Sequence, residues 1–154
     1  MKALVVYDSQ FGNTQKIAET AAKELGGAVI RRAGEVKASD WKGITLLVVG
    51  SPTQGGRPTV LMQTFLTEIR SEEINGVKAV CFDTRLAEAE QNFALRFLIR
   101  TIGYAAEKME KILINKGAKP AGETGGFIVK GKEGPIREGE TERVKKWVKK
   151  IQLS

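Results

Sequence analysis

A short polar segment carries the residues of this sequence that are best suited to chemistry. Residues 9–14 read SQFGNT and lead directly into a segment with helical periodicity. Hydroxyl groups, an amide and backbone N–H groups would converge at the start of that helix, where the helix dipole adds positive potential. This arrangement binds a phosphate dianion without a lysine or an arginine. The alternative is an ordinary helix start that is capped by Thr14 or Asn13.

Two further polar segments each follow an apolar run. Residues 50–58 read GSPTQGGRP, and their glycines and prolines fix unusual backbone paths with exposed N–H groups. Such a loop can wrap a flat heteroaromatic ring, and the alternative is a tight turn, for which nine residues are generous. Residues 83–85 read DTR. Arg85 would hold a ring oxygen or a negative charge there, or it is a solvated surface charge.

Apolar β-branched runs alternate with helix-periodic segments along the whole chain. This order is typical of an α/β domain with a parallel sheet, in which ligands bind at the carboxyl ends of the strands. We expect one domain over residues 1–154. The predicted strands cover residues 3–7, 28–32, 44–49, 77–82 and 126–129. The predicted helices have inner faces of Ile17, Ala21 and Leu25, of Leu61, Phe65 and Ile69 after a start at Pro58, of Ile102, Ala106, Met109 and Leu113, and of Val144, Val148 and Ile151.

One segment is too long for a simple connection between a strand and its helix. Residues 84–101 lie between the fourth strand and its crossover helix. Leu86, Ala89, Phe93 and Phe97 recur there at helical spacing, so we predict a helical insert with an apolar stripe. The stripe either covers the core or forms a lid or interface beside a ligand.

Composition excludes several classes of protein. The chain has 154 residues, one cysteine and no histidine, which excludes zinc enzymes, histidine-based triads and a disulfide framework. Cys81 lies within an apolar strand, where a buried structural thiol is expected. No signal-peptide pattern precedes the first strand, and no apolar stretch approaches the roughly 20 residues of a membrane span. We therefore expect a cytoplasmic protein.

The three polar loops together resemble those of a known family. VVYDSQFGNT before a helix, VVGSPTQGGRP about 35 residues later and CFDTR on the next strand are similar to the three FMN-binding loops of the flavodoxin family. The resemblance spans essentially the whole chain. It implies a flavodoxin-like three-layer α/β/α sandwich, a five-stranded parallel sheet in the order 2-1-3-4-5 and a non-covalently bound FMN. It also implies that the phosphate is held by Ser9, Gln10, Phe11, Gly12, Asn13 and Thr14, and that the flavin ring is bordered by Pro52, Thr53, Gln54, Gly55 and Gly56 on one side and by Asp83, Thr84 and Arg85 on the other.

The sequence departs from the family pattern at the positions that would contact the flavin ring. Flavodoxins commonly place aromatic side chains from the second and third loops against the flavin, whereas Gln54 stands at one such position and residues 83–85 contain no aromatic side chain. Phe11, or Phe93 and Phe97 of the insert, would replace them. With weak stacking and a positive charge near the ring, the reduced anionic flavin should be less disfavoured. We therefore predict a hydroquinone potential that is less negative than in acidic flavodoxins.

Three functions are compatible with these features. The first is an FMN-dependent electron carrier between redox proteins, and the second is an FMN-dependent oxidoreductase of the same fold, of the quinone reductase or protoporphyrinogen dehydrogenase type. The third is a nucleic-acid-binding module without flavin, which the loops and the lack of a basic stripe with interleaved aromatics argue against. A monomer and a dimer are both conceivable.

Charge is distributed unevenly along the chain. The formal net charge is +7, and residues 78–154 hold 16 basic and 10 acidic side chains, against 9 and 8 in residues 1–77. The excess includes two arginines of the insert and four lysines near the end, and its simplest interpretation is a solvated helix face. In a carrier it would steer the protein toward an acidic redox partner. The residues concerned are Arg96, Arg100, Lys145, Lys146, Lys149 and Lys150.

Overall fold

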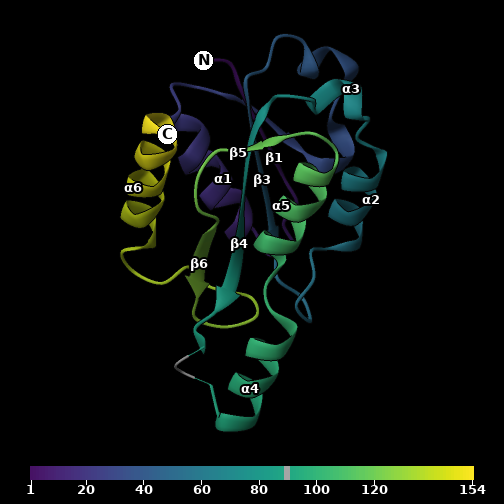
Figure 1. The fold of residues 1–154 in the computed structure, drawn as a ribbon. Coiled ribbons are helices and arrows are strands. Elements are labelled where there is room, and N and C mark those ends of the chain that lie inside the picture. The colour runs from purple at the N-terminus through teal and green to yellow at the C-terminus, as the bar shows by residue number, and fades with distance from the viewer. Residues whose placement is uncertain (89–90) are drawn as a thin grey trace.

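The computed structural model describes residues 1–88 and 91–154, and a parallel β-sheet forms its middle layer (Figure 1). The strand order is β2-β1-β3-β4-β5, and each pairing between neighbours is parallel. This confirms the predicted flavodoxin-like α/β fold and its order 2-1-3-4-5. The strands are β1 (Ala3–Tyr7), β2 (Val29–Arg32), β3 (Leu46–Pro52), β4 (Lys78–Leu86), β5 (Lys119–Pro120) and β6 (Gly125–Val129).

Two short strands share the fifth position of the sheet. Strand β5 pairs with the beginning of β4, and β6 pairs with its end. The sequence predicted only the second of these strands. The chain leaves the sheet between them at Gly122, whose φ of +145° is a conformation that favours glycine.

Helices cover both faces of the sheet and enclose two apolar clusters. Successive side chains of a strand point to opposite faces, so Leu4 and Val6 contact one cluster and Ala3 and Val5 the other. Helices α2, α3 and α5 cover the first cluster, and α1 and α6 cover the second. The helices are α1 (Asn13–Glu24), α2 (Val60–Glu68), α3 (Ser71–Ile74), α4 (Phe93–Ile102), α5 (Ala105–Asn115) and α6 (Glu140–Leu153), and the 3-10 helices are η1 (Ala33–Glu35) and η2 (Ala38–Trp41).

Two predicted helix faces need correction. Helix α2 is capped by Thr59, whose side chain accepts a hydrogen bond from the Met62 N–H, and Leu61 is 39% exposed. Its buried face is Met62, Phe65, Leu66 and Ile69, because the spacing i, i+3, i+4, i+7 keeps to one side of a helix whereas i, i+4, i+8 drifts around it. Ile102 ends α4 instead of belonging to α5, since Gly103 separates the two helices.

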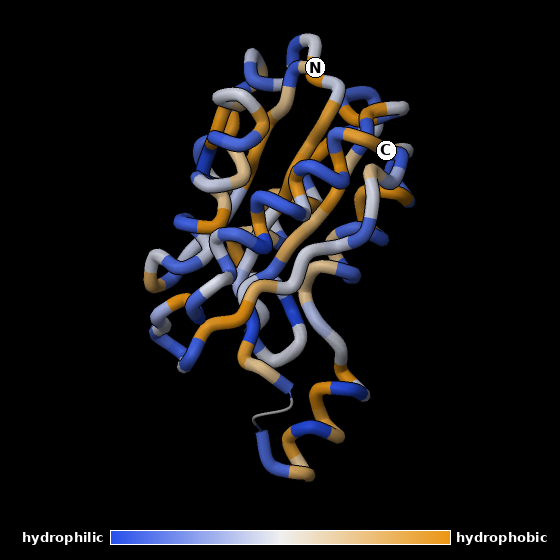
Figure 2. Tube along the Cα trace, turned by 90° about the vertical axis from the view of Figure 1, so that its left-hand side faces the viewer, coloured by the Kyte–Doolittle hydropathy of each residue, from blue (hydrophilic) through white to orange (hydrophobic). Residues whose placement is uncertain are grey.

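The predicted insert contains helix α4, which lies apart from the layers. Residues 84–86 continue strand β4, and α4 begins only at Phe93. None of its residues is buried, and Phe93 and Phe97 are 83% and 67% exposed. Figure 2 shows this helix extending beyond the body, with hydrophobic and hydrophilic residues alternating along it. The alternative in which the stripe covers the core is therefore wrong, because other helices already cover both faces; Ala89 of that stripe lies outside the described residues.

Candidate functional site

The first polar loop leaves backbone N–H groups available at the start of α1. Gly12 is the N-cap residue, with φ +88°, and no side chain caps the helix. The Ser9 hydroxyl instead accepts a hydrogen bond from the Gly12 N–H at 3.0 Å. No acceptor among residues 1–88 and 91–154 takes the N–H of Asn13 or Thr14. The expected alternative, a start capped by Thr14 or Asn13, is wrong, and the free donors suit an anion.

Two side chains at this helix start hold other segments in place. The hydroxyl of Thr14, which is buried, hydrogen-bonds to the hydroxyl of Thr84 at the end of β4, over 2.9 Å. The Asn13 amide donates a hydrogen bond to the Glu133 carbonyl at 3.1 Å. These bonds connect the first loop to strand β4 and to the segment that follows β6.

The buried carboxylate of Asp8 holds the start of the first loop in place. Asp8 directly follows β1, and its carboxylate accepts hydrogen bonds from the Thr59 hydroxyl at 2.5 Å and from Arg32 at 3.2 Å. Arg32 also donates to the Ser9 carbonyl at 2.8 Å. This network was not predicted from the sequence, although an aspartate immediately after a buried strand is a signal that points to it.

The second loop is a tight turn that reaches the first loop. The backbones of Gln54 and Arg57 exchange hydrogen bonds of 2.8 and 3.1 Å, and Gly55 and Gly56 between them have positive φ angles. Glycine is favoured at both positions because a residue with a side chain rarely adopts a positive φ angle. The Gln54 amide then donates to the Gln10 side-chain carbonyl at 2.6 Å.

The third loop is part of strand β4, and its two charged residues pair with each other. Asp83 is fully buried, and its carboxylate accepts hydrogen bonds from Arg85 at 2.6 and 2.8 Å and from the Ala106 N–H at 3.0 Å. The Arg85 guanidinium lies 3.5 Å from the ring centre of Tyr104, and its side chain is 16% exposed. Arg85 is thus not the solvated surface charge of the alternative interpretation.

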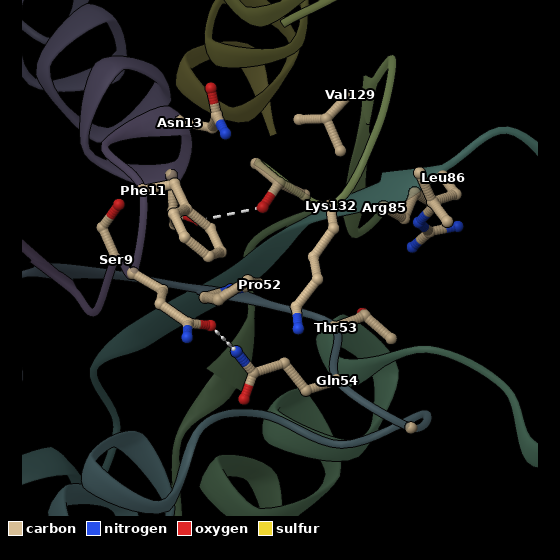
Figure 3. Close-up of a pocket in the computed structure, with 14 residues that line it drawn as sticks. Ser9, Phe11, Asn13, Pro52, Thr53, Gln54, Arg85, Leu86, Val129 and Lys132 are labelled. Atoms are coloured by element: carbon tan, nitrogen blue, oxygen red, sulfur yellow. Dashed lines mark hydrogen bonds between the residues drawn. The ribbon is translucent and has the colours of Figure 1, made fainter. Parts of the chain in front are cut away.

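These loops enclose one pocket of about 510 Å³, which we call the loop pocket (Figure 3). The three residues of the predicted set that do not line it are Gly12, Gly56 and Asp83, which shape the backbone around it. Leu86, Val129 and Lys132 line it without having been predicted. Strands β4 and β6 end side by side at the sheet edge where the loops lie, and that topology could have identified these three residues. The predicted residues that line it are Ser9, Gln10, Phe11, Asn13, Thr14, Pro52, Thr53, Gln54, Gly55, Thr84 and Arg85.

Two cationic side chains line the loop pocket, and one of them, Arg85, is paired with the buried Asp83. Among the described residues that line it there is no aspartate or glutamate, whereas Arg85 and Lys132 both contribute cations. Figure 3 shows the Lys132 side chain extending across the pocket toward Gln54. Phe11 is the one aromatic residue of the described lining. The pocket can therefore accept an anionic group at the α1 start and a flat group between the second and third loops.

Comparison with known proteins agrees with this geometry. A family model described as flavodoxin matches residues 5–147. The chain belongs to the flavodoxin family.

Solved structures of other flavodoxins have the same fold. An archaeal flavodoxin is 19% identical, with a TM-score of 0.75 and 99% of each chain covered. Flavodoxin 2 from Bacillus cereus is 20% identical, with a TM-score of 0.72 and the same coverage. The two-electron reduced flavodoxin of Megasphaera elsdenii is 18% identical, with a TM-score of 0.66, and 95% of this chain and 97% of that chain are covered.

The described part of this flavodoxin-family chain includes no helix that is both long and apolar enough to cross a membrane.

Proposed function

We propose that the protein binds FMN non-covalently in the loop pocket and carries electrons between redox proteins. The observation that supports this best is the meeting of three separate loops around one pocket whose anion-binding end is the start of α1. The volume of about 510 Å³ lies within the roughly 300–1,000 Å³ of typical cofactor sites. FMN supplies one- and two-electron redox chemistry when it is bound.

The first loop would hold the phosphate of FMN. The N–H groups of Asn13 and Thr14 have no acceptor among the described residues, and the Thr14 hydroxyl lies beside them. The helix dipole stabilises a dianion at this position. The described lining contains no carboxylate that would repel the phosphate, so the residues present fit the group.

The second and third loops would border the ring. Pro52, Thr53, Gln54 and Gly55 of the second loop line the pocket and would border one side of the ring, and Thr84 and Arg85, which also line it, would border the other. Gly56 and Asp83 would act indirectly, through the turn and through the position of Arg85. Phe11 is the aromatic side chain of the described lining, whereas Phe93 and Phe97 lie outside it.

Reconstitution tests the proposal. Titrating the FMN-free protein with FMN should give a yellow one-to-one complex with flavin absorbance bands. Riboflavin, which lacks the phosphate, is the matched control ligand and should bind at least about tenfold more weakly, since it loses charge-assisted hydrogen bonds of roughly 1.5–3 kcal/mol each. A protein that stays colourless and takes up no FMN contradicts the proposal.

The predicted potential is tested on the same complex. Lys132 near the ring should favour the anionic hydroquinone, and Arg85 should add less because it is paired with Asp83, so the second potential should be less negative than in flavodoxins with acidic sites. Replacing Lys132 with glutamine should make that potential more negative, whereas Lys130→Gln, in the same segment but outside the pocket lining, should change it less. A very low second potential in the unmodified protein would contradict this expectation.

We expect residues 1–154 to act as one unit, in the cytoplasm, with an acidic redox protein as partner. Steady-state turnover of NAD(P)H and a quinone by the isolated protein would separate an oxidoreductase of the quinone reductase or protoporphyrinogen dehydrogenase type from a carrier.

A further inference from the structure

A second pocket of about 180 Å³ adjoins the loop pocket under helix α4, and we call it the insert pocket. The α4 side chains that line it are all apolar: Leu95, Leu98, Ile99 and Ile102. Thr53, Gly55, Arg85 and Leu86 line both pockets. The insert pocket therefore begins where the loop pocket ends, on the side where the second and third loops approach each other.

The C-terminal end of α4 is held firmly against the second loop. A Cβ atom at Gly56 would lie 1.9 Å from the Ile102 side chain, so the two residues are in close contact. Just beyond α4, the Ala105 N–H donates to the Thr53 hydroxyl at 3.0 Å, and Lys108 donates to the Gly56 carbonyl at 2.5 Å. These contacts hold α4 in the position that forms one wall of the insert pocket.

Core packing does not account for the apolar side chains that α4 turns toward this pocket. No residue of α4 is buried, and Leu98 remains 49% exposed. Phe97, its neighbour in sequence, is 67% exposed and lies outside the pocket lining. An apolar wall that adjoins a cofactor-sized pocket is typical of a ligand site.

One cation interrupts the apolar lining. Arg85 uses Nε and Nη2 to hold Asp83, and its remaining nitrogen, Nη1, makes no hydrogen bond with the described residues. The guanidinium is fixed in orientation because it also stacks on Tyr104, which lines the same pocket. A ligand here would have apolar surface for α4 and an oxygen that accepts a hydrogen bond from Arg85. The volume, below the roughly 300 Å³ of drug-sized sites, limits it to one or two rings.

We propose that the insert pocket binds a small planar apolar molecule with a carbonyl oxygen, of the quinone class, beside the ring of the bound FMN. This proposal rests on the proposed function, because the wall that the two pockets share is the wall that would border the flavin ring. It assigns to the insert the role of a ligand site, which an electron carrier for proteins alone does not need.

Binding to the oxidised FMN-loaded protein tests the proposal without any turnover. The probe is 2-methyl-1,4-naphthoquinone, followed by calorimetry and by methyl NMR. We expect one-to-one binding that shifts the methyl signals of Leu98, Ile99 and Ile102. The exposed methyl groups of Val60 on α2 should not shift, since they lie outside both pockets.

Two neighbouring variants provide the decisive comparison. Leu98→Gln should weaken probe binding at least tenfold, and Phe97→Gln should change it less than twofold, while FMN content stays the same in both. Equal effects of the two variants, no binding of the probe, or displacement of FMN by the probe would each overturn the proposal. FMN content is measured first and separately, so a protein that takes up no FMN would show instead that the proposed function itself fails.

Discussion

A pair of buried hydroxyl groups connects the start of α1 to the end of strand β4. Thr14 and Thr84 are 1% and 4% exposed and are hydrogen-bonded to each other across 2.9 Å. A hydroxyl can donate one hydrogen bond and accept others, so Thr14 can contact Thr84 and a phosphate oxygen together. Thr14 would thereby have a role in the proposed phosphate binding in addition to its place in the helix.

Replacing Thr14 with valine keeps the shape of the side chain and removes the hydroxyl. We expect FMN affinity to fall about 10- to 100-fold, because a hydrogen bond to a charged group contributes roughly 1.5–3 kcal/mol. Thr20→Val is the matched control on the same helix, because the Thr20 hydroxyl donates to the Lys16 carbonyl and has no other partner among the described residues. Fluorescence titration with FMN and with riboflavin checks this. An equal loss of affinity for both ligands would show that Thr14 acts on the fold and not on the phosphate.

The attachment of α4 to the second loop depends on one glycine. Gly56 has φ +78°, and a Cβ there would collide with Ile102. Gly55, the preceding residue, has φ +56°, and a Cβ there would meet nothing within 4 Å. An alanine at Gly55 would therefore introduce backbone strain alone, whereas an alanine at Gly56 would introduce both strain and a steric clash.

Gly56→Ala should lower the free energy of unfolding by about 2–4 kcal/mol, as the sum of strain and overpacking. Gly55→Ala should cost only the strain, about 1–2 kcal/mol. Urea unfolding measures both. Adding Ile102→Ala to the Gly56→Ala variant should recover part of the loss, and a double variant that is no more stable than Gly56→Ala would contradict the steric explanation.

A buried carboxylate fastens helix α6 to strand β6. Glu140 is 1% exposed and accepts hydrogen bonds from the Ile128 N–H, Arg143 and Arg137. Burial opposes the ionised form, but the hydrogen bonds from Arg143, Ile128 and Arg137 together lower the pKa of Glu140 below its ordinary value of 4.5. Its stabilising contribution is therefore fully present above the unfolded-chain pKa and is lost as pH falls through the lower folded-state pKa.

Glu140→Gln should lower the free energy of unfolding at pH 7 by about 2 kcal/mol or more, because two arginines lose their partner. The difference from the unmodified protein should shrink as pH falls below about 4.5, because Glu140 then takes up a proton in the unfolded chain first, and it should disappear once pH has fallen through the lower folded-state pKa. Urea unfolding between pH 3 and pH 7 checks this. Glu142→Gln, two residues further along α6 and exposed, should leave stability nearly unchanged. A difference that stays constant with pH would show that the charge is not what matters.

The elements that the sequence predicted best are those whose pattern is local. The run at residues 3–7 is apolar throughout because both faces of its strand are buried, and Ile17 and Ala21 repeat at helical spacing because one side of α1 packs on the sheet. The first two polar loops were found because each contains an unusual density of glycine and hydroxyl residues after such a strand. These elements and loops could be predicted because their pattern lies within a short stretch of sequence.

The features that the sequence could not predict depend on distant partners. The position of Arg85 is determined by Asp83 and by Tyr104, which lies beyond the insert. Lys132 reaches the pocket only because β6 lies beside β4, and no periodic pattern surrounds it. The apolar residues of α4 indicated a helix but not the surface that it would face, since periodicity does not identify the neighbour.

At the scale of the whole molecule, positive charge lies in two different places. Lysines of α6, such as Lys145 and Lys149, lie on a flanking helix and approach Glu142 and Glu24 at 2.7 and 4.0 Å. Arg85 and Lys132 lie instead at the pocket, where Arg85 is paired with the buried Asp83 and Lys132 has no ion pair among the described residues. Charges at the entrance of a site affect the encounter with a redox partner more than charges elsewhere, because screening limits their range to about 10 Å at 0.1 M salt.

This difference predicts how the reduced, FMN-loaded protein should react with small charged oxidants. Oxidation by ferricyanide, an anion, should slow severalfold as ionic strength rises from about 10 to 300 mM, whereas oxidation by hexaammineruthenium(III), a cation, should not slow. Stopped-flow absorbance measures both rates. Lys132→Gln should weaken the salt dependence with ferricyanide, and Lys149→Gln, which removes the same charge from α6, should leave it nearly unchanged. If both variants weakened it equally, the net charge of +7 and not the charge at the pocket would control the encounter, and the preference for an acidic partner would lose its local basis.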